Sequence, residues 1–391
     1  MNSQNTPVHI KLWHREFWQM AVANLLLSMS VYMLIPVLPL WLASEENFSA
    51  TEIGLSMGIF AVGLYLMGPF VSYLVQRYRR NIVCLWAIVA QVVTLALLLY
   101  INSKRMEFVD LWLVLVERLI LGAAFGMAQM VLSSTLIIDT CESYQRTEAN
   151  HSASWFGRFA LSLGPLAGLL ILHLWDFHIV IFVAMGCAFL SLLLISAVTF
   201  PFRAPEEHIH LFSNDRFMLG QGGVLFVNLL LITLAIGIML SRMDAVAYGI
   251  LMVGFLLALL AQRFMFKDAE LKSEVVTGLI LLMAAQLIIL TQHTQTASYI
   301  ASAFTGMATG IIGSRFLLFF IKLSRHCQRG TSQSTFMLAW ETGLALGVGL
   351  SYLLVTRMPY RIMWMALALS IAALVMYNVF THGWFMKHKN R

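Results

Sequence analysis

Apolar segments of about twenty residues or more recur along the whole chain and are separated by short polar segments. A helix needs about 20 mostly apolar residues to cross the hydrocarbon core of a membrane. The segments are continuous and do not alternate apolar with polar residues, as membrane β-strands do. The pattern predicts an all-α integral membrane protein with twelve transmembrane helices. They are expected at residues 17–42, 52–76, 82–101, 111–138, 152–174, 178–200, 219–240, 245–265, 274–292, 297–321, 333–355 and 361–380.

The longest polar interruption between the predicted helices is residues 201–218, which contain two prolines and several charges. Such a composition is typical of a linker. It divides the chain into two predicted bundles of six helices each, residues 1–200 and residues 219–391. We expect the linker to lie in the cytoplasm.

Short strings of sequence recur in the two predicted bundles. Asn24 begins Asn-Leu-Leu-Leu in the first helix, and Asn228 begins the same string in the seventh. Gly122 and Gly306 occupy corresponding places in the fourth and tenth helices. Many transporters consist of repeated bundles whose substrate site lies where the repeats meet. The recurrences therefore favour two pseudo-symmetric bundles.

Lysine and arginine are distributed unevenly between the two sets of loops. The chain has 25 of these residues, and a cytoplasmic N-terminus places 17 of them on the cytoplasmic side and five on the other. Cytoplasmic loops of membrane proteins carry an excess of Lys and Arg. The asymmetry predicts that both termini are cytoplasmic. The expected location is the plasma membrane, which is the inner membrane in a bacterium.

The composition argues against several other classes of protein. Hydrophobic residues make up 60% of the chain and charged residues only 11%, against about a quarter in soluble domains. The net charge of +6 comes from residues scattered over short loops, so membrane lipids and not nucleic acid are the expected surroundings. The four cysteines show no paired spacing, which predicts neither disulfides nor a metal site. No cofactor is expected.

The sequence contains no motif that supports an enzyme. It has no HExxH motif, no metal-spaced His and Cys set and no phosphate-binding GxxxxGK(S/T) loop. One GxSxG string runs from Gly54 to Gly58, but it lies in an apolar helical run. A nucleophile elbow requires a strand-to-helix turn. The chain is therefore not expected to be an enzyme.

Five ionisable residues fall well inside predicted helices: Glu117, Arg118, Arg158, Arg315 and Glu341. A charge near the bilayer centre costs roughly 2.5–3.5 kcal/mol on insertion scales, so each is a functional candidate. If all five face one cavity, that cavity is slightly basic and suits an anionic or zwitterionic substrate. The alternative is that the charges pair locally and leave the cavity neutral.

Arg118 shares one helical face with Gly122, Phe125 and Gln129, at positions i, i+4, i+7 and i+11. A cation, a small residue and an amide on one face suit the lining of a water-filled cavity. We therefore expect Arg118 and Gln129 to bind substrate, together with Arg158 and Arg315. The alternative is that Arg118 reaches the membrane surface or pairs with Glu117.

Asn24, Ser28 and Tyr32 form a polar stripe along the first helix at positions i, i+4 and i+8. Polar groups that faced lipid would lack hydrogen-bond partners, so the stripe should face protein or water. It is a candidate for binding substrate, and equally a candidate for hydrogen bonding to a neighbouring helix. Asn228 in the seventh helix has the same two interpretations.

Glu341 lies about eight residues into the eleventh helix, roughly 12 Å deep at helical rise. A carboxylate held away from bulk water is suited to bind and release a proton near neutral pH, as a proton-coupled carrier requires. The alternative is a fixed ion pair with Arg158 or Arg315. Glu117, beside Arg118, is the second candidate for proton coupling.

Four motifs lie at distinctive places in the predicted helices. Residues 36–39, Pro-Val-Leu-Pro, lie toward the end of the first helix, and Gly68-Pro69 with residues 74–80 spans the loop between the second and third. The fourth helix contains residues 118–122, Arg-Leu-Ile-Leu-Gly, and the fifth contains residues 164–168, Gly-Pro-Leu-Ala-Gly. Together they resemble the motifs of the major facilitator superfamily, more specifically its twelve-helix drug:proton antiporter-like branch.

The sequence departs from that family's pattern at a few places. Gln76 and Arg79 stand where the loop motif normally has Asp and Gly, and Ala160 and Leu169 replace two glycines of the fifth-helix motif. By the resemblance, seven residues are expected to serve conformational change: Gly68, Gln76, Arg77, Arg80, Gly164, Pro165 and Gly168.

The resemblance implies a secondary active transporter that moves a small organic solute by alternating access, coupled to protons. The fourth-helix motif implicates Arg118 in this proton coupling. The fifth-helix motif favours export, as in an antiporter, and a monomer is expected. The alternatives are an uptake carrier for a small organic anion or zwitterion, a lipid flippase, or a membrane receptor on the same fold, because a fold does not fix a function.

Overall fold

The computed structural model describes residues 11–102, 110–200, 210–266, 270–355 and 361–390, which form helices and connecting segments without any strand. The helices before the linker are α1 (Arg15–Tyr32), α2 (Leu34–Ser44), α3 (Ala50–Leu66), α4 (Gly68–Arg77), α5 (Arg80–Asn102), α6 (Leu111–Val131), the π-helix η1 (Leu132–Leu136), α7 (Ile137–Asp139), α8 (Arg146–Leu174) and α9 (Phe177–Ser196). Those after it are η2 (Gly220–Gly222), α10 (Gly223–Leu240), α11 (Ala245–Phe264), α12 (Leu271–Thr291), α13 (Gln295–Leu323), η3 (His326–Gln328), α14 (Arg329–Val355), α15 (Arg361–Met376), the π-helix η4 (Tyr377–Thr381) and α16 (His382–His388).

The described residues contain eleven helical segments long and apolar enough to cross a membrane, and a twelfth when the bent pair α3 and α4 counts as one span. These segments correspond to the twelve predicted helices, with ends that differ by up to eight residues. Part of the predicted linker, residues 201–209, lies outside the described residues. The all-α fold with twelve membrane spans is thus confirmed.

Prolines explain two interruptions within these spans. α1 and α2 meet at Met33, and α3 meets α4 at Met67 with a bend of 41°. Proline has no backbone N–H and therefore cannot donate to the carbonyl four residues earlier. Pro36 leaves the carbonyl of Tyr32 without its usual helical donor, and Pro69 does the same for Tyr65. The helices are interrupted at these carbonyls.

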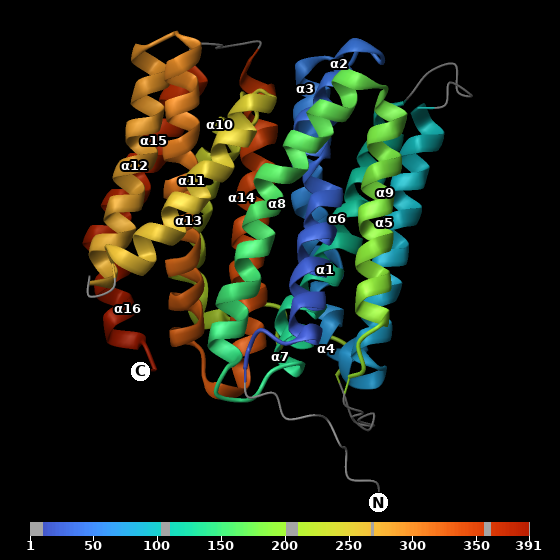
Figure 1. Cartoon of the computed structure of the whole chain (residues 1–391), viewed down its shortest axis with the longest axis vertical. Coiled ribbons are helices and arrows are strands. Elements are labelled where there is room, and N and C mark those ends of the chain that lie inside the picture. Colours follow the sequence, from blue (N-terminus) through green and yellow to red (C-terminus); the bar gives the residue numbers. More distant parts are fainter. Residues whose placement is uncertain (1–10, 103–109, 201–209, 267–269, 356–360, 391) are drawn as a thin grey trace, which may run out of the picture.

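The helices form two groups with the same internal arrangement (Figure 1). In the first group α3 packs on α6, α1 on α8 and α9, and α5 on α6 and α9. In the second group α11 packs on α13, α10 on α14 and α15, and α12 on α13 and α15. Each contact in the first group has its counterpart six spans later in the second. The predicted pseudo-symmetry is therefore present in the helix packing.

Glycines allow the closest helix crossings in each group. Gly122 of α6 faces α3 so closely that a Cβ atom would overlap the carbonyl oxygen of Phe60. Gly306 of α13 faces α11 in the same way, and its Cβ would overlap the carbonyl oxygen of Leu251. The recurrence of Gly122 and Gly306 in the sequence thus corresponds to one type of crossing, present once in each group.

The two groups meet mainly where α3 packs against α14 and α8 against α11. A Cβ atom on Gly54 would lie 2.7 Å from the carbonyl oxygen of Gly349, and the Ser162 hydroxyl donates to the carbonyl oxygen of Tyr248 at 2.6 Å. At the other end of the molecule, a Cβ on Gly330 of α14 would lie 2.9 Å from the Ser134 carbonyl oxygen of η1. The groups are therefore in contact at both ends.

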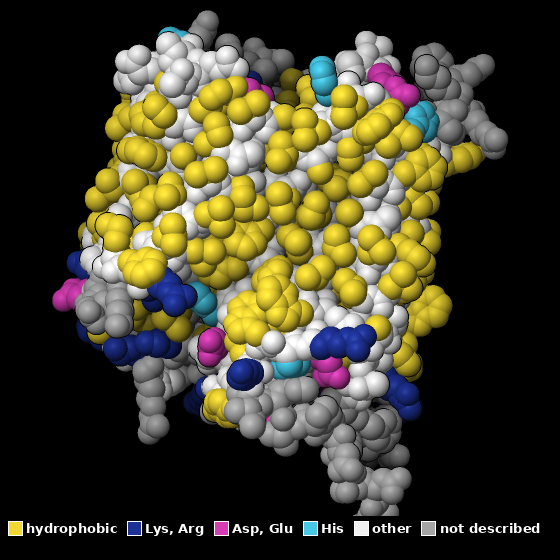
Figure 2. All heavy atoms as spheres, viewed as in Figure 1, with side chains coloured by type: hydrophobic (Ala, Val, Ile, Leu, Met, Phe, Trp, Pro, Cys, Tyr) yellow, Lys and Arg dark blue, Asp and Glu magenta, His cyan; other side chains and the backbone are white. Residues whose placement is uncertain are grey.

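The visible face of the molecule has an apolar belt between two polar ends (Figure 2). Hydrophobic side chains cover the middle of the visible face, whereas Lys and Arg gather toward the lower end (Figure 2). α1 begins and α16 ends at this lower end (Figure 1). We call it the basic end, marked by Arg15, Arg80, Arg146, Arg329 and Lys387. Such a belt fits burial in a bilayer.

Candidate functional site

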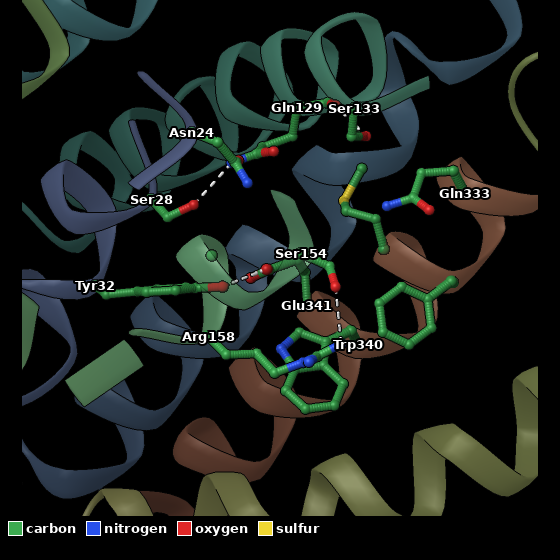
Figure 3. Close-up of a pocket in the computed structure, with 13 residues that line it drawn as sticks. Asn24, Ser28, Tyr32, Gln129, Ser133, Ser154, Arg158, Gln333, Trp340 and Glu341 are labelled. Carbon is green, nitrogen blue, oxygen red and sulfur yellow. Dashed lines mark hydrogen bonds between the residues drawn. The ribbon is translucent and has the colours of Figure 1, made fainter. Parts of the chain in front are cut away.

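A small polar cavity of about 60 Å³ lies between the two helix groups (Figure 3). The first group contributes α1, α6, η1 and α8, and the second contributes α14 alone. We call this the central cavity. It is lined by Asn24, Ser28, Tyr32, Gln129, Ser133, Ser154, Gly157, Arg158, Gln333, Phe336, Met337, Trp340 and Glu341.

The polar stripe of α1 faces this cavity and also joins neighbouring helices. Asn24 Nδ2 donates to the carbonyl oxygen of Ala153 in α8 at 3.0 Å. Ser28 Oγ accepts a hydrogen bond from Gln129 Nε2 in α6 at 2.8 Å. Asn24 Oδ1 has no hydrogen-bond partner within the described part of the chain. The stripe therefore combines both roles considered for it, since it joins helices and presents polar atoms to the cavity.

Glu341 and Tyr32 connect the two groups across the cavity. Tyr32 Oη of α1 donates a short hydrogen bond to the Glu341 carboxylate of α14 (Figure 3). Both side chains are buried, with 4% and 6% of their surfaces exposed. Glu341 forms no ion pair within 4 Å with Arg158 or Arg315 in the described structure. The carboxylate is therefore held by a neutral donor and not by a fixed cation.

Arg158 of α8 provides the positive charge of the cavity. Its Nη2 donates to Ser154 Oγ at 3.0 Å, and its guanidinium lies 4.6 Å from the ring centroid of Trp155. An aromatic face stabilises a cation at this distance. Its Nη1 has no hydrogen-bond partner among the described residues. The cavity thus contains a cation from one group and a carboxylate from the other.

Arg118 lies in a separate cavity of about 30 Å³ on the other side of Tyr32. Its guanidinium is 5.0 Å from the ring centroid of Phe60, and its Nε and Nη1 lack partners among the described residues. Tyr32 and Glu341 line both this cavity and the central one. The hydrogen-bonded pair therefore forms a partition between Arg118 and the Arg158 side of the site.

Besides Arg118, three more of the candidate residues do not line the central cavity. Arg315 of α13 forms a partly buried ion pair with Glu274 of α12, and Asn228 Nδ2 donates to the Ala373 carbonyl oxygen at 3.0 Å. Glu117 is fully buried, and neither of its carboxylate oxygens has a partner in the described structure. The five intramembrane charges therefore do not share one cavity. The charge of Arg315 is paired with that of Glu274 instead.

Part of the lining was not predicted from the sequence. Gln333, Met337 and Glu341 follow one another at i, i+4 and i+8 on α14, and Ser154 precedes Arg158 by four residues on α8. Residues at this spacing lie on one helical face. Gln333, Met337 and Ser154 could have been predicted, because each shares a helical face with an intramembrane charge.

The loop-motif residues lie at the basic end, beside the linker. Phe217 of the linker packs directly on Gly68, where a Cβ atom would overlap its ring, and the Ser213 N–H donates to the Pro69 carbonyl oxygen at 3.0 Å. Arg80 forms an ion pair with Asp139 of α7. The side chains of Gln76 and Arg77 form no hydrogen bond or ion pair within the described residues. The linker therefore packs on the bend between α3 and α4.

The fifth-helix motif packs α8 onto α1 at the interruption of the first span. A Cβ on Gly164 would lie 3.2 Å from the Met29 carbonyl oxygen, and one on Gly168 would lie 2.7 Å from that of Met33. Pro165 lies inside α8 between these contacts. The motif thus places α8 close enough to α1 for Arg158 and Tyr32 to line the same cavity.

Comparisons with known proteins agree with this architecture. A family model described as Major Facilitator Superfamily matches residues 20–267. No curated protein sequence matches the chain. Among solved structures, a mutant of the nucleoside transporter NupG is 13% identical with a TM-score of 0.69, covering 94% of this chain and 100% of its own.

Two other solved structures have similar folds. The human organic anion transporter MFSD10 (TETRAN) is 15% identical with a TM-score of 0.68, and the similarity covers 93% of this chain and 98% of that one. The POT family transporter PepTSo is 10% identical with a TM-score of 0.73, covering 96% of this chain and 99% of that one. At these identities the similarity shows the fold alone.

Proposed function

Because this chain belongs to the major facilitator superfamily, a family of transporters and not of enzymes, we propose that it moves a small organic solute across the membrane by alternating access. The observation that carries the proposal is the central cavity, which both helix groups line and which contains Arg158 and Glu341 from opposite groups. A site between two repeats is exposed to either side when the repeats rock against each other.

The size of the central cavity fits a closed state of such a cycle. About 60 Å³ accommodates roughly two water molecules, whereas small-molecule sites measure about 300–1,000 Å³. A solute therefore enters only after the helix groups separate at one end. A larger cavity of about 880 Å³ lies between the groups at the end opposite the basic end, lined by residues that include His173, Arg242 and Tyr352. It is the proposed approach to the site from that side.

The charges of the cavity favour a zwitterionic or anionic solute over a lipophilic cation. Arg158 Nη1, Asn24 Oδ1 and Gln333 Oε1 have no hydrogen-bond partner within the described residues. Buried polar groups require such partners, and a solute with an acidic group and polar atoms supplies them. Arg158 is the proposed ligand of the acidic group, with Asn24, Ser28 and Gln129 around it.

Glu341 is the proposed proton-coupling residue. Protonation would remove its charge and give the carboxyl group an O–H, so that Glu341 would no longer be only an acceptor toward Tyr32. Because Tyr32 and Glu341 belong to different helix groups, this change alters a contact that the groups must break when they separate. Glu117, with Arg118 beside it, remains the second candidate.

The orientation and direction of transport belong to the same proposal. The basic end is proposed to face the cytoplasm, with both termini and the linker on that side. Residues 1–200 and 219–391 are proposed to be the two rocking units of a monomer in the plasma membrane. Export is proposed because the motif from Gly164 to Gly168 resembles that of antiporters.

A test is to reconstitute the purified protein into proteoliposomes that contain a pH-sensitive dye and to add amino-acid-like solutes, organic anions and cationic drugs. We expect proton movement that depends on a zwitterionic or anionic solute, and its loss in Glu341→Gln. Glu117→Gln is the matched variant, because Glu117 is also a buried acid but lies outside the central cavity. It should retain coupling.

Each other outcome changes the proposal in a defined way. Loss of coupling only in Glu117→Gln would assign the proton-binding site to Glu117 in α6 instead of Glu341. Solute movement without proton flux, unaffected by either variant, would indicate a uniporter or a sodium-coupled carrier. A response to cationic drugs alone would contradict the role of Arg158.

A further inference from the structure

A polar cavity of about 180 Å³ lies at the basic end, apart from the central cavity. It is enclosed by the end of the fourth span, the start of α8, the start of α14 and the linker. Its lining consists of Arg80, Ser134, Thr135, Ile138, Asp139, Arg146, Asp215, Arg216, Cys327, Arg329, Gly330 and Thr331. Four arginines thus face two aspartates, and the cavity has an excess of positive charge.

Both aspartates are already engaged by neighbouring groups. Asp139 forms an ion pair with Arg80. Asp215 accepts a hydrogen bond from the Thr331 hydroxyl at 3.0 Å, and its carboxylate lies 3.9 Å from Arg216 Nε. The acids of the cavity are therefore matched by two of its four arginines.

Arg146 and Arg329 are the other two arginines, and neither forms an ion pair within the described part of the chain. Both side chains are only partly exposed. Arg146 Nε is buried and has no hydrogen-bond partner among the described residues. A buried guanidinium donor without a partner is unfavourable, so this arrangement favours binding of an acceptor with negative charge.

The start of α14 lies on the same side of the cavity. α14 begins at Arg329, so Gly330 and Thr331 belong to its first turn. The first N–H groups of a helix have no partner within the helix, and a long helix carries a partial positive charge at this end. α14 is 27 residues long. Guanidinium groups and helix N-termini together are typical ligands of phosphate groups.

We propose that this cavity binds a phosphate-type oxyanion, with Arg146 and Arg329 as its principal ligands. Arg146 belongs to α8 of the first group, and Arg329 belongs to α14 of the second. One oxyanion between them therefore joins the two groups at the basic end and stabilises the arrangement in which this end is closed. The source is either a free phosphate or the headgroup of an anionic phospholipid. The inference does not depend on which solute is transported.

The experiment is thermal unfolding of the purified full chain in a neutral detergent, with inorganic phosphate titrated at constant ionic strength against sodium chloride. A ligand that binds only the folded state raises the Tm saturably. We expect this increase with phosphate and not with chloride. Arg146→Gln and Arg329→Gln should each raise the apparent Kd for phosphate about tenfold or more, because each removes a charge-assisted hydrogen bond.

Arg263→Gln is the control, since Arg263 is an exposed arginine near the end of α11 and outside the cavity. It should respond to phosphate as the natural chain does. An equal loss in Arg263→Gln would mean non-specific charge screening and would overturn the proposal. Size-exclusion profiles of the variants without phosphate identify any variant that is misfolded. If one of the two cavity variants misfolds, the other still tests the site.

A second series identifies the source of the oxyanion. The same chains are placed in nanodiscs of phosphatidylcholine, with or without phosphatidylglycerol. Stabilisation by phosphatidylglycerol that requires Arg146 and Arg329, without an effect of free phosphate, assigns the site to a lipid headgroup. Stabilisation by free phosphate in both kinds of nanodisc assigns it to a soluble ion. If neither ligand stabilises the chain, the proposal is wrong.

Discussion

At the scale of single residues, the hydrogen bond from Tyr32 to Glu341 is the contact on which proton coupling is proposed to depend. Tyr32→Phe removes the donor but keeps the ring, whose centroid lies 6.4 Å from that of Phe125. We expect a loss of proton-coupled transport of about tenfold or more, because the carboxylate loses its hydrogen bond while the packing is retained. Transport in proteoliposomes and thermal unfolding measure the two effects separately.

Tyr65→Phe is the matched control for this substitution. Tyr65 Oη lies 2.9 Å from Thr342 Oγ1 and also connects α3 to α14, but it lines neither cavity next to Glu341. It should transport nearly as the natural chain does. If Tyr32→Phe retains full coupling, or if both variants lose it equally, the hydrogen bond to Glu341 has no specific role.

The candidate site could be predicted in part, because some functional residues can be recognised from the sequence immediately around them. Glu341 and Arg158 could be predicted because each is an ionisable residue in an apolar run. The stripe from Asn24 to Tyr32 could be predicted from its helical spacing. The partners of these residues depend on tertiary packing. Glu274 stands at the start of a predicted helix, so its pairing with Arg315 could not be foreseen from spacing.

At the scale of helices, the glycine crossings determine how closely α3 approaches α6 and how closely α11 approaches α13. Gly122→Ala and Gly306→Ala each place a Cβ atom against a backbone carbonyl, which cannot move aside as a side chain can. We expect each to lower the free energy of unfolding by about 1–3 kcal/mol, as overpacking does. Thermal unfolding in detergent is the measurement.

Gly186→Ala is the comparison for both glycine variants. Gly186 lies in α9, and a Cβ atom there would have no neighbour within 4 Å. Alanine is the better helix former by roughly 0.5–1 kcal/mol, so this variant should be as stable as the natural chain or slightly more stable. If Gly122→Ala and Gly306→Ala behave like Gly186→Ala, the helix crossings accommodate a larger side chain than the structure indicates.

The helices themselves were predicted well, because the length of an apolar run is a property of the local sequence. The packing of Phe217 on Gly68 was not, since it joins a linker to a bend far away in the chain. The π-helix at residues 132–136 was also not predicted. It carries Ser133 into the central cavity, and no local pattern distinguishes it from an ordinary helical turn.

At the scale of the whole molecule, alternating access requires that the two helix groups separate at each end in turn. Contacts at both ends hold the groups together in the described structure, and the 60 Å³ central cavity leaves no room for an organic solute. A covalent link between the groups at one end should therefore stop transport without unfolding the protein. The basic end offers a suitable pair in Ser134 of η1 and Gly330 of α14.

A Cβ atom on Gly330 would lie 3.4 Å from the Cβ of Ser134, close to the separation of about 3.5–4.5 Å in disulfides. It would also lie 2.9 Å from the Ser134 carbonyl oxygen, so the start of α14 must shift slightly to accept the new side chain. Ser134→Cys with Gly330→Cys, in a background with Cys327→Ser, should form a disulfide under mild oxidation. We expect solute transport in proteoliposomes to fall to background and to return after reduction. Each variant with only one of the two introduced cysteines should transport in both conditions. Continued transport by fully crosslinked protein would mean that the groups do not separate at this end during the cycle, and that the solute follows another route.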